Sequence, residues 1–255
     1  MPIRMVSVDG VGAGTGTTSG GTAINCISTA GIESGTCSEP VSDDTLVTLT
    51  ATPSLGSNFT GWTGCDSPSG NLCAQTVAGG DETVQPSFGT VPEITVAPIS
   101  LDFGLRPLAA GATASQDIVI TNDGLAGLTI TAVSLIGADA GEFAVTNDTG
   151  EGSLAPAASR TVSVAFDPSS LGSKSATLRI LSDDSDEPTV DVPLIGVGDN
   201  RIFDYGDAPD SYATLGVSDG ARHEVPDSGG VVFLGISVDT ELDGQPSATA
   251  QGDDT

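Results

Sequence analysis

The sequence predicts an all-β chain of at least three small modules in a row, the central one a sandwich of two sheets. Val, Ile, Leu and Thr alternate with polar residues over short stretches, which is the period of a half-buried strand. Glycine and proline, 34 and 15 of the 255 residues, separate these stretches as turn formers do. Aromatic residues make up 4% of the chain, which favours several thin cores over one large core.

The chain is strongly acidic, with 34 Asp and Glu against 7 Lys and Arg and a net charge of −27. Carboxylates in this excess repel phosphates, so nucleic acid and anionic membrane are not expected partners. The same carboxylates offer oxygen ligands to hard cations such as calcium. The sequence contains no apolar stretch with the length of a membrane span or of a signal peptide.

The first segment, residues 1–90, is expected to form a small β module. Its glycine-rich stretch as far as Gly21 predicts a loose connection after the first strand. In the strand at 46–51, threonine alternates with apolar residues, as on a sheet with one buried face. The predicted strands are centred on Val6 and Val8 and cover 46–51, 58–62 and 83–88.

The four cysteines, Cys26, Cys37, Cys65 and Cys73, all lie in the first segment. They have no Cys-x-x-Cys spacing and the single His223 is far away, so a zinc site is not expected. Two disulfides are the better interpretation, and they require an oxidising compartment. Three pairings are possible, and spacing favours 26 with 37 and 65 with 73. Each pair closes a short loop and stabilises the module by about 2.5–3 kcal/mol.

Gly61-Trp62-x-Gly64-Cys65, which follows the alternating strand 46–51, resembles the divergent bacterial B-repeat of the internalin type. The closing Val84-x-x-x-Phe88 extends the resemblance over nearly the whole segment. It implies a small module of exported and cell-surface proteins, often found in tandem. Trp62, beside Cys65, is expected in the core rather than as a platform for a ligand.

The second segment, residues 93–198, lies between Val91-Pro92 and a glycine-rich stretch at 196–198. Short alternating strands at regular intervals, joined by turn-forming residues, are typical of a sandwich of two sheets. The predicted strands cover 94–96, 115–121, 128–136, 161–166, 175–181 and 190–195.

Five strings of the second segment resemble the choice-of-anchor D module, an immunoglobulin-like sandwich related to the Hydin type. The resemblance implies a structural spacer or a protein-binding unit without catalytic residues. Phe103, Phe143 and Phe166 are expected to fill the core, and Asn122 and Asp167-Pro168 to set turns. The strings are Ile99–Gly104, Ile118–Asn122, Gly141–Phe143, Val164–Pro168 and Ile180–Asp184.

The third segment, residues 200–255, is acidic and short of regular alternation. Asp204-Tyr205-Gly206-Asp207-Ala208-Pro209-Asp210, Ala221-Arg222-His223 and Gly252-Asp253-Asp254 resemble the start of the GEVED-type module of bacterial surface and secreted proteins. Calcium is the one cofactor that this segment suggests, because a loop or an extended strand could direct several carboxylates to one point. The candidate ligands are Asp204, Asp207, Asp210, Asp239, Glu241 and Asp243.

These observations favour a non-catalytic, structural and adhesion segment of a large secreted or cell-surface bacterial protein. The sequence contains neither a nucleophile elbow nor a phosphate-binding loop, and an enzyme is not expected. The expected partners are other proteins or cell-surface ligands. Disulfides without a signal sequence indicate a piece of a longer exported polypeptide. An alternative makes the modules accessory parts of a secreted hydrolase whose catalytic domain lies outside this chain, and another makes the central sandwich a protein-binding domain.

Overall fold

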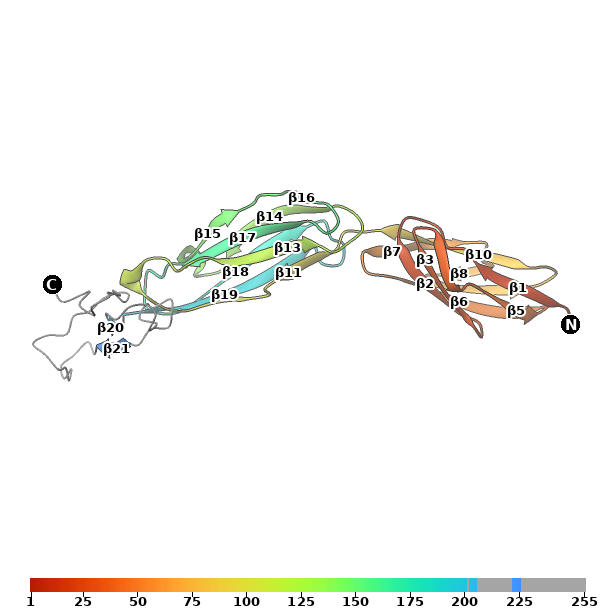
Figure 1. Cartoon of the computed structure of the whole chain (residues 1–255), viewed down its shortest axis with the longest axis horizontal. Helices are drawn as coiled ribbons and strands as arrows, with labels where there is room; N and C mark the ends of the chain where they lie inside the picture. The colour runs from red at the N-terminus through yellow and green to blue at the C-terminus, as the bar shows by residue number, and fades with distance from the viewer. Residues whose placement is uncertain (201, 206–221, 226–255) are drawn as a thin grey trace, which may run out of the picture.

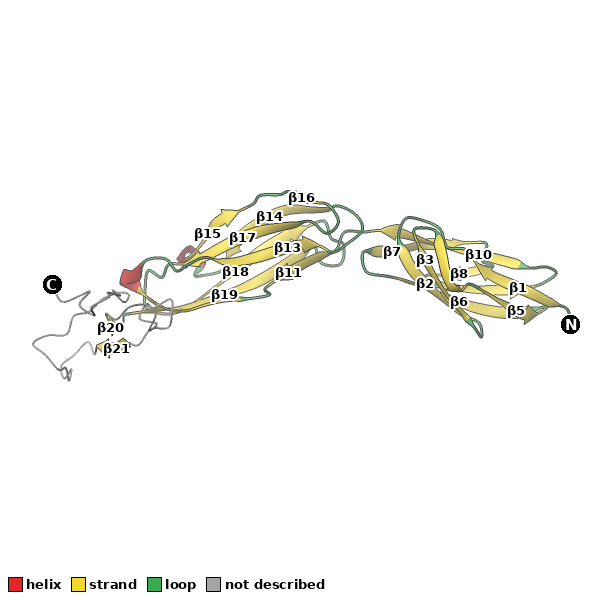
Figure 2. Cartoon of the chain, viewed as in Figure 1, coloured by secondary structure: helices red, strands yellow, loops and turns green. Residues whose placement is uncertain are grey.

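The computed structural model describes residues 1–200, 202–205 and 222–225, and this part of the chain confirms the predicted all-β class. Two elongated sandwiches follow one another along the long axis, and the N terminus lies at the outer end of the first (Figure 1). The helices among the described residues are single 3-10 turns, η1 (Leu108–Ala110) and η2 (Ala140–Glu142) (Figure 2). No helix in this part has the length and hydrophobicity needed to cross a membrane.

The first sandwich packs a four-stranded sheet against a six-stranded one. The four-stranded sheet has the order β5-β1-β10-β7, with β1 (Ile3–Val8), β5 (Ser38–Ser42), β7 (Ser57–Thr63) and β10 (Glu82–Thr90). The six-stranded sheet has the order β4-β3-β2-β6-β9-β8, with β2 (Thr15–Gly20), β3 (Ile24–Thr29), β4 (Ile32–Thr36), β6 (Thr45–Pro53), β8 (Ser67–Ser69) and β9 (Leu72–Val77).

Aliphatic side chains and three aromatic rings fill the space between these sheets. Phe88 is fully buried, and its ring contacts the ring of Phe59, which in turn contacts Trp62. Trp62 is half-buried against the aliphatic core, and its Nε1 atom is buried without a hydrogen-bond partner. Trp62 therefore acts mainly through packing. The aliphatic core consists of Val6, Val8, Ile24, Val47, Leu49, Val77 and Val84.

The second half of the glycine-rich stretch before Gly21 forms the strand β2 (Thr15–Gly20), so the connection predicted from its composition is limited to residues 9–14. β2 pairs with β3 on one side and β6 on the other. A Cβ atom on Gly16 would collide with the ring of Phe88 from the facing sheet. Glycine is needed here because the facing sheet approaches closely, while Thr15 and Thr17 keep the outward half of the alternation.

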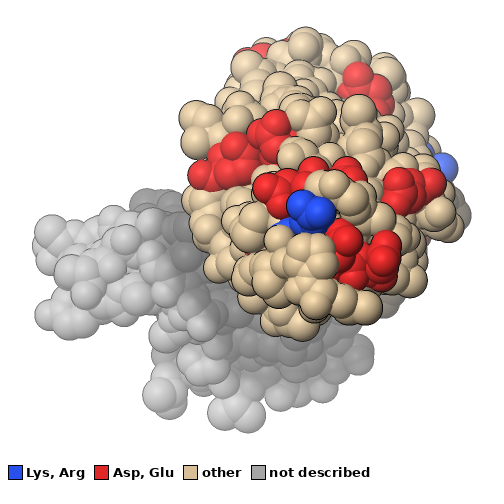
Figure 3. Space-filling view, turned by 90° about the vertical axis from the view of Figure 1, so that its right-hand side faces the viewer, with Lys and Arg blue, Asp and Glu red and all other residues tan. Residues whose placement is uncertain are grey.

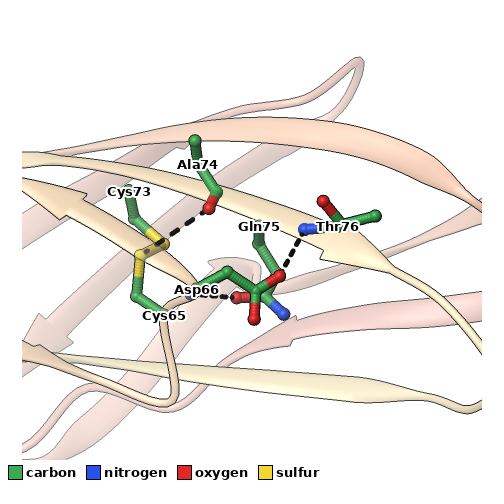
Figure 4. The surroundings of a disulfide bond; sticks show 6 residues. All are labelled: Cys65, Asp66, Cys73, Ala74, Gln75 and Thr76. Carbon is green, nitrogen blue, oxygen red and sulfur yellow. Dashed lines mark hydrogen bonds between the residues drawn. A yellow bond between two sulfur atoms is a disulfide. The ribbon is translucent and has the colours of Figure 1, made fainter.

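Two disulfides tie the first sandwich together. Cys26 on β3 bonds to Cys37, with a distance of 2.01 Å between the sulfur atoms. Cys65, in the loop after β7, bonds to Cys73 on β9 (Figure 4). These are the pairs favoured by the sequence spacing. Around the second disulfide, Asp66 holds the loop against β9 (Figure 4). Its backbone N–H donates to the side-chain oxygen of Gln75, and its carboxylate accepts from the backbone N–H of Thr76.

The second sandwich consists of a four-stranded and a five-stranded sheet. The first has the order β11-β13-β17-β15, with β11 (Ile94–Ala97), β13 (Gln116–Asn122), β15 (Phe143–Asp148) and β17 (Ser159–Phe166). The second has the order β12-β19-β18-β14-β16, with β12 (Leu101–Pro107), β14 (Leu128–Ile136), β16 (Ser153–Leu154), β18 (Gly172–Ser182) and β19 (Thr189–Asp199).

Phe103, Phe143 and Phe166 meet at one end of the core of the second sandwich. Their ring centroids lie 4.9–6.0 Å apart, and all three side chains are buried. Contacts between aromatic rings at these separations add to the stability gained from burial. The structure thus places the three phenylalanines in the core, as the resemblance to the choice-of-anchor D module implies. In the third segment, β20 (Ile202–Tyr205) pairs with β21 (Arg222–Val225).

Candidate functional site

The link between the two sandwiches is held by backbone hydrogen bonds from both sides. The ladder of β10 and β7 runs as far as the pair of Thr90 and Ser57. The next residue, Val91, donates its N–H to the carbonyl of Gly56 in the first sandwich, at 2.9 Å. The carbonyl of Val91 accepts from the N–H groups of Leu125 and the following residue in the second sandwich, at 3.1 and 3.2 Å. The backbone of the linker is therefore hydrogen-bonded to both sandwiches at Val91.

Two glycines bring the sandwiches into contact beside this linker. Gly56 lies in the turn between β6 and β7, and Gly124 lies in the turn between β13 and β14. A Cβ atom on Gly56 would lie 2.8 Å from the Cα atom of Gly124, a distance that real side chains do not adopt. The two turns therefore pack backbone against backbone, and a side chain at this point would push the modules apart.

Two buried polar side chains fix the start of the second sandwich. Asn122 is fully buried, and its amide oxygen accepts from the N–H groups of Glu93 and Gly124 while its NH2 group donates to the carbonyls of Ala126 and Leu154. Asn122 thus sets the turn that was predicted for it. Asp184, in the loop between β18 and β19, is 1% exposed and accepts from the N–H of Ile94 at 2.8 Å.

Three carboxylates from distant parts of the sequence converge at this end of the second sandwich. Glu93 follows the linker, and Asp184 and Asp186 lie in the loop between β18 and β19. One oxygen from each side chain falls within 4.8 Å of the other two. We call these residues the junction triad. Asp184 is buried, Glu93 is half-buried and Asp186 is exposed, so the group opens to solvent on one side.

The surroundings of the junction triad raise the pKa values of Glu93 and Asp186 and lower that of Asp184. Burial raises the pKa of Glu93, and the charges of Asp186, Asp184, Glu187 and Asp123 raise it further. The pKa of Asp186 is raised by its hydrogen bond to Asp184 and by the charge of Asp184. Burial also acts to raise the pKa of Asp184, but backbone N–H donors, the first from Ile94, outweigh it and lower this pKa. The buried Asp184 carboxylate therefore stays charged, and its charge contributes to the raised pKa values of Glu93 and Asp186.

The donor set of the junction triad suits a hard cation. Calcium takes six to eight oxygen ligands at about 2.3–2.6 Å, so two ligand oxygens on one ion lie up to about 5 Å apart. The three carboxylate oxygens meet that limit, and solvent has access through the exposed Asp186. A bound cation would offset the repulsion described above. The triad is therefore a candidate metal site among the described residues.

The candidate calcium ligands predicted in the third segment cannot be compared with this site. Asp204 lies in β20, of which the structure describes the strand alone. The other predicted ligands, Asp207, Asp210, Asp239, Glu241 and Asp243, lie outside the described residues. Sequence reasoning missed the junction triad because Glu93 and Asp184 stand about ninety residues apart and meet only through the fold. The Ser182-Asp183-Asp184 string was a visible signal, but it was interpreted as a feature of the module.

A shallow groove of about 420 Å³ lies between β12, β18 and β19 in the second sandwich. Leu105 and Ile195 line it with half-exposed apolar side chains, and Asp102 and Lys174 are its ionisable residues. Lys174 is drawn toward Glu142, with 3.9 Å between the Nζ and Oε1 atoms. The Asp102 carboxylate accepts from the backbone N–H of Gly104, so both ionisable residues of the groove have partners.

Residues 89–190 match the family model described as "ASH: Abnormal spindle-like microcephaly-assoc'd, ASPM-SPD-2-Hydin". The second sandwich therefore contains an ASH domain, an immunoglobulin-like fold, in agreement with the Hydin-type relationship implied by the sequence. No curated protein matches the sequence. The resemblances of the flanking segments to the B-repeat and the GEVED-type module stay predictions.

Several solved structures are similar to parts of this chain at low sequence identity. The VesB protease of Vibrio cholerae is 22% identical, covers 41% of this chain and 31% of its own, and has a TM-score of 0.34. The ASH/PapD-like domain of human CEP192 is 18% identical over 42% of this chain and 84% of its own, with a TM-score of 0.30. BcpA, the major pilin subunit of Bacillus cereus, is 9% identical over 79% of this chain and 71% of its own, with a TM-score of 0.30. The chain thus matches less than a third of the length of VesB, and these likenesses concern the fold alone.

Proposed function

We propose that this chain is a non-catalytic spacer and adhesion segment of a large secreted or cell-surface bacterial protein. The observation that carries the proposal is the junction, where Val91 is hydrogen-bonded to both sandwiches and Gly56 packs on Gly124. A linker held from both sides limits the bending between modules. Two sandwiches fixed end to end hold whatever they carry at a set distance, which is the task of a spacer (Figure 1).

The disulfides support a location outside the cell. All the cysteines of the chain are paired, and disulfides persist in oxidising compartments such as the cell exterior. The first sandwich has a small core, and small domains bury too little apolar surface to be stable without additional links. The two disulfides supply these links where thiols are not kept reduced.

A cation at the junction triad is the finer part of this proposal. Glu93 directly follows the linker and Asp184 holds the N–H of Ile94, so an ion bound between them would fasten the start of the second sandwich. Calcium is the cation whose ligand chemistry fits carboxylates that open to solvent, and extracellular modules bind it at roughly 0.1–1 mM. The spacer would then be stiffest where calcium is abundant.

Residual dipolar couplings of the whole chain test the spacer function. If the junction is rigid, the two sandwiches of the unmodified protein report the same alignment tensor. The substitution Gly56→Ala places a Cβ atom against the backbone of Gly124, so the two sandwiches should then report different tensors. Gly79→Ala is the matched control, because Gly79 has the same left-handed backbone, with φ of 74° against 70°, and open space around its Cβ position. Different tensors in the unmodified protein would contradict the proposal.

A further inference from the structure

The six-stranded sheet of the first sandwich has an outer face without charge. Its strands β4, β3, β2, β6, β9 and β8 contain a single charged residue, Glu33. Glu33 pairs with Ser28, which is 2% exposed, and directly paired residues of antiparallel strands point to the same side of a sheet. Glu33 therefore lies on the buried side. In a chain of net charge −27, the whole solvent-facing side of this sheet is neutral.

Several carboxylates of the first sandwich gather at one end. Asp43 and Asp44 lie in the turn between β5 and β6, and Asp81 lies in the turn between β9 and β10. Asp43 pairs with Arg4, and Asp81 accepts from the N–H of Met5, so these groups surround the N-terminal end. Figure 3 shows carboxylates clustered around a basic side chain on this end. The acidic end and the neutral face are thus separate surfaces of one module.

The neutral face consists mainly of threonine and serine with single aliphatic side chains between them. Thr17 lies across the strands from Ile27 on one side and Thr52 on the other. In the next row, Thr50 stands between Ser19 and Leu72. Four aliphatic side chains on this face are strongly exposed: Ile27 at 41%, Ile32 at 72%, Leu46 at 63% and Leu72 at 43%. We call this surface the threonine face.

The size of the threonine face limits what it can hold by itself. Six strands at a spacing of about 4.8 Å, each about 20 Å long, give an area on the order of 500 Å². A stable protein complex buries about 800 Å² on each partner. The strands alone give a modest footprint, which suits an extended partner that many copies contact at once.

The side chains of the threonine face indicate the chemistry of that partner. Protein interfaces are enriched in aromatic residues, Met and Arg, and the strands of this sheet contain none of these. A polyanion would find no cation here, and a polycation no carboxylate. Ser and Thr hydroxyls both donate and accept hydrogen bonds, while the Thr methyl groups, Ile27 and Leu72 offer small apolar patches. A neutral polymer that presents hydroxyl groups and C–H groups side by side matches this pattern.

We propose that the threonine face binds a flat, neutral polysaccharide. This inference deepens the adhesion part of the proposed function and rests on it, while the spacer part stands without it. The tensor comparison of Gly56→Ala addresses the spacer alone, so failure of one proposal is distinguishable from failure of the other.

Depletion from solution tests the proposal. The whole protein is mixed with insoluble cellulose, β-1,3-glucan or mannan, and with cross-linked carboxymethyl cellulose, which has the cellulose backbone with added negative charge. We expect at least one neutral polysaccharide to remove the protein from solution, and the carboxymethyl form to bind at least tenfold less. If none of the neutral polysaccharides removes the protein, the proposal is wrong.

Charge placed on the threonine face provides the matched variants. Thr50→Glu and Thr50→Lys each put one charge in the middle of the face, and either sign should lower binding at least tenfold because the partner is neutral. Thr95→Glu is the control, since Thr95 is an exposed strand residue of the second sandwich. Unchanged melting temperatures show that the variants are folded. Equal binding by all three variants would overturn the assignment, and so would a dimer in sedimentation that Thr50→Glu disperses, because the face would then join copies of the chain.

Discussion

At the scale of single residues, buried polar side chains decide how the loops of the first sandwich are held. Glu39 on β5 is 2% exposed, and its carboxylate accepts from the backbone N–H groups of Thr22 and Ala23 and from the hydroxyl of Thr22. Gly21, with φ of 56°, leaves the space that one carboxylate oxygen occupies, because a Cβ atom there would collide with it. Glu39 thus fastens the turn between β2 and β3 to the other sheet.

The substitution Glu39→Gln should destabilise the first sandwich by about 1–3 kcal/mol. The amide keeps the volume of the side chain, but it removes the charge that strengthens these hydrogen bonds and turns an NH2 group toward backbone donors. Chemical denaturation measures the effect. Asp44→Asn is the control, because it removes one charge from an exposed turn residue. Equal stability of the two variants would show that the Glu39 carboxylate does not hold the turn.

The ion pair of Asp148 and Arg160 predicts an acid-dependent loss of stability in the second sandwich. Two parallel hydrogen bonds of 2.8 and 2.7 Å join the side chains, and the Arg160 guanidinium lowers the pKa of Asp148 below its usual 3.8. A lowered pKa stabilises the fold above the unfolded value, and this contribution is lost as pH falls below about 4 toward the folded pKa. Asp148→Asn should therefore cost about 1 kcal/mol at pH 7, and the difference from the unmodified protein should shrink below pH 4.

The pair of Arg179 and Asp191 is the matched control for this prediction. It has the same geometry, with hydrogen bonds of 2.8 and 2.7 Å, but both side chains are 41% exposed, against 12% and 26% in the pair of Arg160 and Asp148. Exposed pairs contribute little because water screens them. Asp191→Asn should thus change the free energy of unfolding less than Asp148→Asn does. Equal losses would mean that burial does not set the strength of these pairs.

At the scale of elements, alternation predicts the longer strands, and glycine gives a wrong indication where two sheets approach closely. The alternating stretches at 46–51 and 128–136 correspond to β6 and β14 because each buries one face. The glycines of β2 predict a connection instead of a strand, since glycine usually marks turns. Gly16 is instead an inward strand residue that makes room for Phe88. The need for glycine at this position depends on where Phe88 lies in the facing sheet, and the alternation of residues along β2 does not predict that contact.

Local sequence also does not predict the edge strands or the carboxylates that meet in the junction triad. β15 and β16 lie at sheet edges, where half or more of the side chains meet solvent and the alternation is weak. Neither strand is predicted from the sequence, and only Phe143, at the start of β15, belongs to one of the strings of the family resemblance. The junction triad depends on β11 lying beside the loop after β18, which results from the packing of the two sheets against each other. Contacts between distant segments therefore mark the limit of sequence reasoning for this chain.

The junction triad predicts that calcium stabilises the second sandwich and that Glu93→Gln removes this effect. With a dissociation constant of about 0.1–1 mM, 10 mM calcium adds roughly 1.4–2.7 kcal/mol to the free energy of unfolding. Without calcium, the raised pKa of Glu93 means that stability falls as pH rises above 4.5, so Glu93→Gln should stabilise the metal-free protein at pH 7. Thermal melts with calcium and with chelator measure both effects.

Glu151→Gln controls for the loss of one carboxylate elsewhere in the second sandwich, and it should keep the full response to calcium. The outcome that contradicts a site at the junction is a calcium response of Glu93→Gln equal to that of the unmodified protein. In that case the carboxylates of the third segment would be the next to vary, starting with Asp239 and Asp243. Their alternating spacing made them candidates in the sequence.

At the scale of the whole molecule, two separate cores are joined by a short polar junction. The first core is centred on Val6, Leu49 and Val84, and the second on Ile118, Phe166 and Leu178, with no residue in common. The junction adds backbone hydrogen bonds and a contact between glycines, but no large apolar surface. Orientation between the modules is therefore fixed by groups that contribute little to the stability of either core.

This arrangement predicts two melting transitions with different responses to ions. The net charge of −27 makes each module repel itself and its neighbour, so raising NaCl from 10 to 150 mM should raise both melting temperatures as the screening length falls from about 30 to 8 Å. Calcium at matched ionic strength should raise the transition of the second sandwich alone, because the junction triad belongs to it. Differential scanning calorimetry measures both transitions and so separates general screening by salt from calcium binding at the junction triad. Magnesium at the same concentration is a further control. If calcium raises both transitions equally, its effect is general screening, and the junction triad does not bind the ion that its geometry fits.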